Sequence, residues 1–214
     1  SEFALPILSF DNQLVFNMIC GFIIAVLAGT VIIGGLTRIA KASSWLVPIM
    51  GGLYVLTATF ILIANFEDVP SVIKIIFLDA FTGTSVAGGT LMGVIMYGIQ
   101  RGAFSNEAGI GTEALIHGTA KTNNPIKQGF VAMIGPVFDT LLICTATAVV
   151  IILSGLWMGD QYSGVSLTAM AFQAFLGSAG IAVVFLCVVF FGISTIFTYS
   201  YYGSVCARFL FGPR

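Results

Sequence analysis

The sequence predicts an all-α polytopic membrane protein, and its composition and the length of its apolar runs are the main evidence. Of its 214 residues, 58% are hydrophobic and 8% are charged, whereas soluble domains carry about 25% charged residues. Each of four runs exceeds the roughly 18 apolar residues that cross a bilayer core: Val15–Gly35, Trp45–Phe66, Ile126–Leu153 and Gly180–Tyr202. We therefore expect a single transmembrane domain over residues 1–214, embedded in a lipid bilayer.

The basic residues predict the orientation of the crossings, because Lys and Arg concentrate in short cytoplasmic loops. Six of the eight basic residues fall on one side of a consistent topology: Arg38, Lys41, Lys121, Lys127, Arg208 and Arg214. The expected crossings are residues 13–36, 45–66, 85–120, 126–154 and 179–209. Residues 158–177 are expected to form an outer loop with a short surface helix.

Several function classes are excluded by the same residues. A formal charge of -1 with scattered basic residues offers no field for nucleic acid. No nucleophile elbow, zinc motif or phosphate-binding glycine loop is present, so no enzyme and no cofactor are expected. The four cysteines lie in or beside apolar runs and are interpreted as small hydrophobic residues. The chain begins without Met or a signal peptide and looks like an internal fragment.

The third crossing is too long for one helix. Residues 85–120 would form a straight helix of about 54 Å, far more than the bilayer core. Near the middle stand Gly102, Gly109 and Gly111, together with Ser105 and Asn106, whose side chains are expected to cap a second segment. The sequence therefore predicts two half-helices, 85–103 and 107–120, with a break near 104–109.

A break at membrane depth indicates a binding site, because lipid cannot satisfy the freed amides and carbonyls. In transporters such breaks bind anionic groups through free amides and cations through free carbonyls. The composition of residues 104–111 suits the binding of both anionic groups and cations. Two alternatives remain open, namely a packing kink, and a channel or non-transporting membrane subunit with a kinked helix. A channel would show repeated polar positions along a pore, whereas here the polar residues gather at one break and one helix face.

Three charged residues form a predicted network near the break. Arg101 is expected to neutralise the negative charge of Glu107 or Asp139. Ionisable residues inside a membrane are costly, so those that are not neutralised in this way are candidates for a direct role in function. Structural ion pairing and direct participation in transport both remain possible. His117 lies near the cytoplasmic end of this crossing and is expected to cap the helix or to lie at the membrane interface. A role in proton relay is the alternative.

The last crossing carries a second polar group of residues. Residues at i, i+3 and i+4 share a helix face, so the Phe191 carbonyl and the Ser194 and Thr195 hydroxyls can converge on a small cation. Tyr199 extends this face by one turn. The alternative is that these hydroxyls bond back to their own backbone, as Ser and Thr commonly do in membrane helices.

The segment from Phe104 to Gly155, beginning FSNEAGIGTEALIHGTAKTNNPIKQGF, resembles the signature region of the alanine or glycine:cation symporter family, within the amino acid–polyamine–organocation group. VIIGGLTRIA, LVPIMGGLYVL and FGISTIFTYSYYG are similar to other spans of that family, so the resemblance covers nearly the whole chain. It implies part of a LeuT-like fold with two inverted five-helix repeats, and further helices of a longer transporter as partners.

The resemblance also implies sodium-coupled symport of a small neutral amino acid, alanine or glycine, across a prokaryotic cytoplasmic membrane. Ser194, Thr195 and the Phe191 carbonyl match half of the family's sodium site. Tyr199 stands where the family usually carries Trp, and Thr112-Glu113-Ala114 replaces Ser-Ala-Pro. The residues expected to bind substrate are Phe104, Ser105, Asn106, Glu107, Ala108, Gly109, Gly111, Thr112 and Tyr199.

Overall fold

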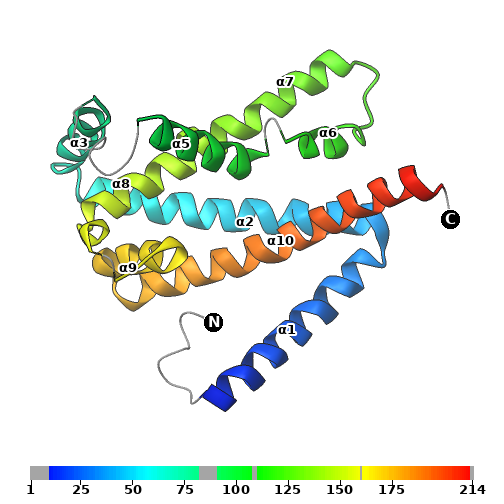
Figure 1. The fold of residues 1–214 in the computed structure, drawn as a ribbon, viewed down its shortest axis with the longest axis horizontal. Coiled ribbons are helices and arrows are strands. Elements are labelled where there is room, and N and C mark those ends of the chain that lie inside the picture. Colours follow the sequence, from blue (N-terminus) through cyan, green and yellow to red (C-terminus); the bar gives the residue numbers. More distant parts are fainter. Residues whose placement is uncertain (1–9, 82–90, 108–109, 160, 213–214) are drawn as a thin grey trace. The chain divides into compact units, whose positions relative to one another are not determined.

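The computed structural model describes residues 10–81, 91–107, 110–159 and 161–212. In these ranges every regular element is a helix (Figure 1). The chain divides into two compact units, one formed by Ser1–Tyr54 with Gly159–Arg214 and the other by Val55–Met158. We call them unit 1 and unit 2 and describe each by itself. The prediction of one transmembrane domain over residues 1–214 stays a prediction.

Four described helices are long and apolar enough to cross a membrane. They cover Leu14–Ile32, Gly35–Ala64, Pro125–Leu153 and Ser178–Phe211. These are the four segments that the apolar runs indicate, so the expectation of four long apolar helices is confirmed.

Unit 1 begins with α1 (Phe10–Ile32), which connects to α2 (Gly35–Ala64) through a turn of two residues. The sequence predicted a longer loop before residue 45, but the chain is helical from Gly35 onward. Gly35 has φ 71°, which glycine adopts without steric cost, so the chain reverses within two residues. The Arg38 guanidinium donates to the Thr30 carbonyl at 3.4 Å, at the end of α1 where carbonyls lack helical partners.

The remaining elements of unit 1 are α9 (Gly164–Leu176) and α10 (Ser178–Phe211), which pack against each other. A Cβ on Gly180 would lie 2.3 Å from the Phe172 carbonyl oxygen, so only glycine permits this close approach. α1 also packs on α10, and Ala28, Ile39 and Phe197 form a buried cluster there.

Unit 2 contains a helix that the sequence did not predict, α3 (Val69–Phe81), which packs on α8 (Thr145–Leu153). α7 (Pro125–Pro136) begins where the Asn124 side chain accepts hydrogen bonds from the amides of Ile126 and Lys127. It continues without interruption into the π-helix η1 (Val137–Cys144) and then into α8. A short 3-10 turn, η2 (Leu156–Met158), ends the unit.

Candidate functional site

The predicted broken helix is present as two helices, α5 (Leu91–Asn106) and α6 (Thr112–His117), which Figure 1 shows as separate coils. Glu107 has φ 56°, which is uncommon for a residue other than glycine, and Gly111 has φ 92°. The Ile110 amide donates to the Glu107 carbonyl at 3.3 Å, which closes a turn between them.

The break begins later than the sequence indicated. Phe104, Ser105 and Asn106 were expected in the irregular stretch, but they form the last turn of α5, and α6 covers only part of the expected second half-helix. α5 ends at Asn106 because the next residue, Glu107, leaves the right-handed region. Ala108 and Gly109, which were also expected to bind substrate, lie outside the described residues.

The expectation that Ser105 and Asn106 cap α6 is wrong, because both side chains bond to η1. The Ser105 hydroxyl donates to Asp139 Oδ2 at 2.5 Å, and the Asn106 amide donates to Thr140 Oγ1 at 3.1 Å. Gly111, which directly precedes α6, supplies no side-chain cap. Two consecutive residues at the end of α5 thus join two consecutive residues of the π-helix, and π-helical turns occur often at functional sites.

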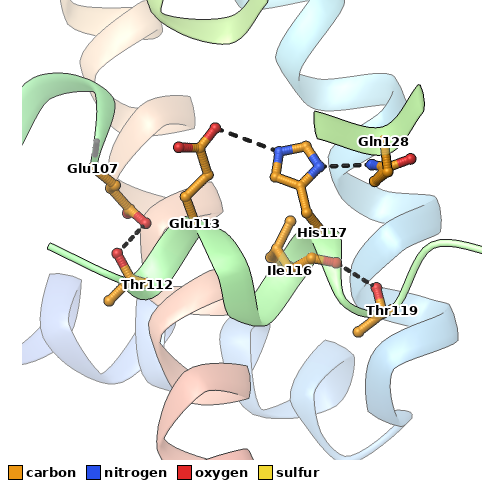
Figure 2. Close-up of polar contacts among 7 residues, drawn as sticks. All are labelled: Glu107, Thr112, Glu113, Ile116, His117, Thr119 and Gln128. Carbon is orange, nitrogen blue, oxygen red and sulfur yellow. Dashed lines mark hydrogen bonds and ion pairs between the residues drawn. The ribbon is translucent and has the colours of Figure 1, made fainter. Parts of the chain in front are cut away.

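Glu107 is half-buried, and its carboxylate spans the break. Its Oε2 accepts a hydrogen bond from the Thr112 hydroxyl at 2.7 Å, as Figure 2 shows. This bond links the last residue before the undescribed pair to the first residue of α6. A charge-assisted bond of this kind is stronger than one between neutral groups. It therefore helps to fix where α6 begins.

Arg101 has a different neighbour from the two carboxylates that the sequence favoured. Its guanidinium donates to the Tyr97 hydroxyl at 2.8 Å and lies 5.0 Å from the centre of that ring. Among the described residues no ion pair joins it to Glu107 or Asp139. Tyr97 lies one helical turn before Arg101, so a pairing within α5 replaces the expected contacts between elements.

His117 lies between α6 and α7. Its Nε2 lies 3.5 Å from the Glu113 carboxylate, one turn earlier, and its Nδ1 lies 2.7 Å from Nε2 of Gln128 on α7 (Figure 2). The ring is thereby positioned by one acidic and one amide side chain. Gln128 was missed by the sequence reading, because its partner is on another helix.

In unit 1 the face of α10 that was expected to bind a cation is regular helix. The buried Ser194 hydroxyl donates to the Phe191 carbonyl at 2.8 Å, and Thr198 donates to the Ser194 carbonyl at 3.1 Å. These are the back-bonds that the sequence left open as the alternative. Within the described chain the Thr195 hydroxyl, which is half-buried, has no such bond.

Tyr199 lies one turn further along α10, and 49% of its surface is exposed. Its ring packs edge to face on Tyr202, with 5.5 Å between the ring centres.

Sequence reasoning missed Thr140 and Cys144 as neighbours of the break. A hydroxyl and a thiol beside Asp139 in an apolar run gave no distinctive signal, since such residues are common in membrane helices.

Comparison with known proteins supports a definite class. The family model described as the sodium:alanine symporter family matches residues 7–214. An uncharacterized transporter of Bacillus subtilis is 43% identical over 204 residues, which are 92% of this chain and 43% of the relative. A sodium/alanine symporter of Methanococcus maripaludis is 37% identical over 200 residues (92% and 44%), and a probable sodium/glutamine symporter of Bacillus subtilis is 35% identical over 204 residues (95% and 43%).

The four apolar helices and the discontinuous helix agree with these relatives, which place the chain in a family of polytopic membrane transporters and not in an enzyme family. The chain belongs to the sodium:alanine symporter family. It spans less than half the length of the curated relatives described above. The family resemblance expected from the FSNEAG segment is thus confirmed.

Proposed function

We propose that the chain is part of a sodium-coupled symporter that moves a small neutral amino acid inward by alternating access. The observation that carries this proposal is the break between α5 and α6, where Glu107 and Gly111 both have positive φ. Irregular backbone is tolerated at membrane depth only where it is buried in protein or lines a cavity. In transporters such an interruption marks the substrate site.

The break supplies the groups that an amino acid requires. An interrupted helix can offer backbone amides to a substrate carboxylate, and the Glu107 carboxylate suits the substrate's ammonium group. The proposed contact residues are those expected from the sequence, namely Phe104, Ser105, Asn106, Glu107, Ala108, Gly109, Gly111, Thr112 and Tyr199. The network of Arg101, Glu107 and Asp139 remains a proposal for a working state in which the guanidinium leaves Tyr97.

The proposed sodium ligands are the Phe191 carbonyl and the hydroxyls of Ser194 and Thr195. Hard oxygen ligands of this kind suit sodium, as they suit other hard cations. The Ser194 hydroxyl already lies 2.8 Å from the Phe191 carbonyl, so both oxygens are close enough to face one ion. Binding would turn the hydroxyl hydrogen away and replace one internal hydrogen bond with two ion contacts.

The proposed architecture is a LeuT-like arrangement of five plus five helices in a prokaryotic cytoplasmic membrane. The match of residues 7–214 to the family and the bacterial relatives support it. Alanine or glycine is the proposed substrate, since the Methanococcus relative bears the name of a sodium/alanine symporter. Glutamine, from the name of the Bacillus relative, is the competing substrate that the experiment must include.

Uptake of labelled alanine, glycine and glutamine by the full-length transporter in liposomes tests this function. We expect alanine or glycine to accumulate when sodium is higher outside than inside. Accumulation should stop when an equal potassium gradient replaces the sodium gradient. Glutamine uptake in preference to alanine would correct the substrate, and uptake of none of the three under a sodium gradient would contradict the proposal.

A further inference from the structure

The first three turns of α2 carry two cations and an indole on one face. Arg38, Lys41 and Trp45 are spaced i, i+3 and i+7, so they lie on the same side of the helix. All three are exposed, and 70% of the Trp45 surface is accessible. Ile39 and Ala42, on the other side, pack in the buried cluster with α1 and α10. We call Arg38, Lys41 and Trp45 the basic face of α2, and it points away from the core of unit 1.

The charge of the basic face is not neutralised by other described residues. The Arg38 guanidinium has five N–H donors, of which one bonds to the Thr30 carbonyl at 3.4 Å. Among the residues that the structure describes, no carboxylate forms an ion pair with Arg38 or Lys41. The whole of α2 contains no acidic residue. The basic face is therefore complementary to an anionic group that the described chain does not supply.

The Arg38 side chain is held at the turn between α1 and α2. A Cβ on Gly34 would lie 1.9 Å from Cδ of Arg38, so the arginine stem lies directly over the backbone of the turn. Two helices that are long and apolar enough to cross a membrane meet at this turn. The turn therefore belongs at a membrane surface, and its basic residues predict the cytoplasmic one.

The order of residues along the basic face matches the layers of a phospholipid monolayer. The two cations lie nearest the turn, where long basic side chains reach phosphate groups. Trp45 lies about 10 Å further along the helix axis than Arg38, at the depth where indole rings are enriched. Exposed Pro48 and Gly52 continue the same side of the helix and are apolar. An acidic protein segment would match the cations but not this apolar continuation.

We propose that the basic face of α2 binds an anionic phospholipid of the cytoplasmic leaflet. The planar Arg38 guanidinium pairs with the lipid phosphate, and the Lys41 ammonium adds a second charge. The Trp45 ring packs on the glycerol and the first carbons of an acyl chain. The inference requires only a membrane transporter, so it stands or falls separately from the proposed substrate and sodium sites.

Quenching of Trp45 fluorescence by lipids with brominated acyl chains tests this proposal, because bromine quenches an indole only in contact. The full-length transporter is placed in phosphatidylcholine liposomes that contain increasing fractions of brominated phosphatidylglycerol or of brominated phosphatidylcholine. The Trp45 signal is the difference between each protein and the same protein with Trp45→Phe. The ratio of the two brominated lipid fractions that give half-maximal quenching measures the preference for the anionic lipid.

We expect wild type to prefer phosphatidylglycerol roughly 30-fold, since each cation near an anionic surface contributes about fivefold. Lys41→Gln, which removes no contact of the described chain, should lower the preference about fivefold. Arg38→Gln combined with Lys41→Gln should abolish it. Lys127→Gln removes an exposed cation of α7 on the same predicted side and should keep the wild-type preference. Quenching by brominated phosphatidylcholine should be equal in all variants, which shows that the helix still faces lipid.

Four results would overturn the proposal. Equal quenching of wild type by the two lipids would mean that the face contacts lipid without selecting charge. A preference that persists in the double variant would place the anionic lipid elsewhere. An equal loss in Lys127→Gln would show an effect of the overall charge and not of this face. Quenching by neither lipid would mean that the remaining helices of the transporter or a second copy cover the basic face.

Discussion

The break between α5 and α6 and the polar face of α10 place similar residues in different backbone environments. At the break the side chains of Ser105 and Asn106 bond across to η1, and the backbone leaves helical geometry at Glu107. On α10 the hydroxyls of Ser194 and Thr198 bond to carbonyls of their own helix, which stays regular. Polar residues in an apolar helix therefore do not by themselves break it.

The difference lies in glycine and in the neighbouring element. Gly111 can hold φ 92°, and η1 offers polar partners that secure the end of α5. On α10 the hydroxyls are satisfied locally, so a cation must displace a hydrogen bond worth about 0.5 to 1.5 kcal/mol. The end of α5 at the break is thus held by contacts to η1, whereas cation binding at the α10 face would require its hydroxyls to rearrange.

The largest expected effect is that of Gly111→Val, which tests whether the positive φ is required. A β-branched residue in this conformation is strained by about 2 to 3 kcal/mol. If that strain shifts the start of α6, alanine uptake should fall roughly 30- to 150-fold. Labelled-alanine uptake at equal protein density measures this.

Gly102→Val is the matched control, because Gly102 is helical and a Cβ there meets nothing within 4 Å. Its uptake should stay within about threefold of wild type, as expected for a helix position with little packing. If both variants lost uptake equally, the region would tolerate no added side chain. The effect of Gly111→Val could then not be attributed to backbone conformation.

The sequence predicts those features of the two regions whose physical cause lies in neighbouring residues of the chain, and it does not predict those that depend on distant residues. The excess length of residues 85–120 and their glycines predicted the break, since both follow from local geometry. The partners of Ser105 and Asn106 are 34 residues away, so no local pattern reveals them. For the same reason the sequence placed the break three residues too early.

Two further elements escaped prediction for different physical reasons. The π-helix η1 shows no hydrophobic pattern distinct from an α-helix, and only Pro136 precedes it. α3 contains apolar residues and a proline near its start, Pro70, and both favour a helix. The segment is too short, however, to be predicted as a membrane crossing. The α10 hydroxyls were recognised, but their sequence spacing suits both a cation site and back-bonding.

The next effect concerns the α10 face. Thr195→Val removes one proposed sodium ligand at nearly constant volume, which should cost about 1 to 3 kcal/mol and raise the sodium requirement roughly five- to 150-fold. Alanine affinity should fall mainly at low sodium, because coupled ligands shift each other's binding reciprocally. Alanine binding across a sodium titration of the full-length transporter measures both.

Thr198→Val is the control for that titration, since its hydroxyl bonds to the Ser194 carbonyl. It should keep the wild-type sodium midpoint. If Thr195→Val also keeps that midpoint, the α10 face is a packing surface and the cation binds elsewhere.

A smaller effect is expected from Thr112→Val at the break. The variant removes the hydrogen bond from Thr112 to Glu107, which is worth about 1 to 1.5 kcal/mol, so alanine affinity should fall roughly five- to twelvefold. Unlike Thr195→Val, the loss should be the same at all sodium concentrations. Thr119→Val, which removes only an exposed bond to the Ile116 carbonyl, should bind alanine as wild type does. If high sodium restored alanine binding in Thr112→Val, the assignment of the substrate to the break and of sodium to the α10 face would be wrong.

The smallest expected effect is on substrate size, at the residue where this chain departs from the family pattern. Tyr199 is half exposed and rests against Tyr202, so its ring can contact a ligand on one side. Tyr199→Trp places a larger ring there and should reduce glutamine uptake relative to alanine by about fivefold, since overfilling a contact costs about 1 kcal/mol. Tyr199→Phe keeps the ring size, so the ratio of the two uptakes should not change in that variant. A ratio altered by Phe but not by Trp would mean that the hydroxyl, not the volume, sets selectivity, and Tyr199 would then belong to the polar contacts of the site.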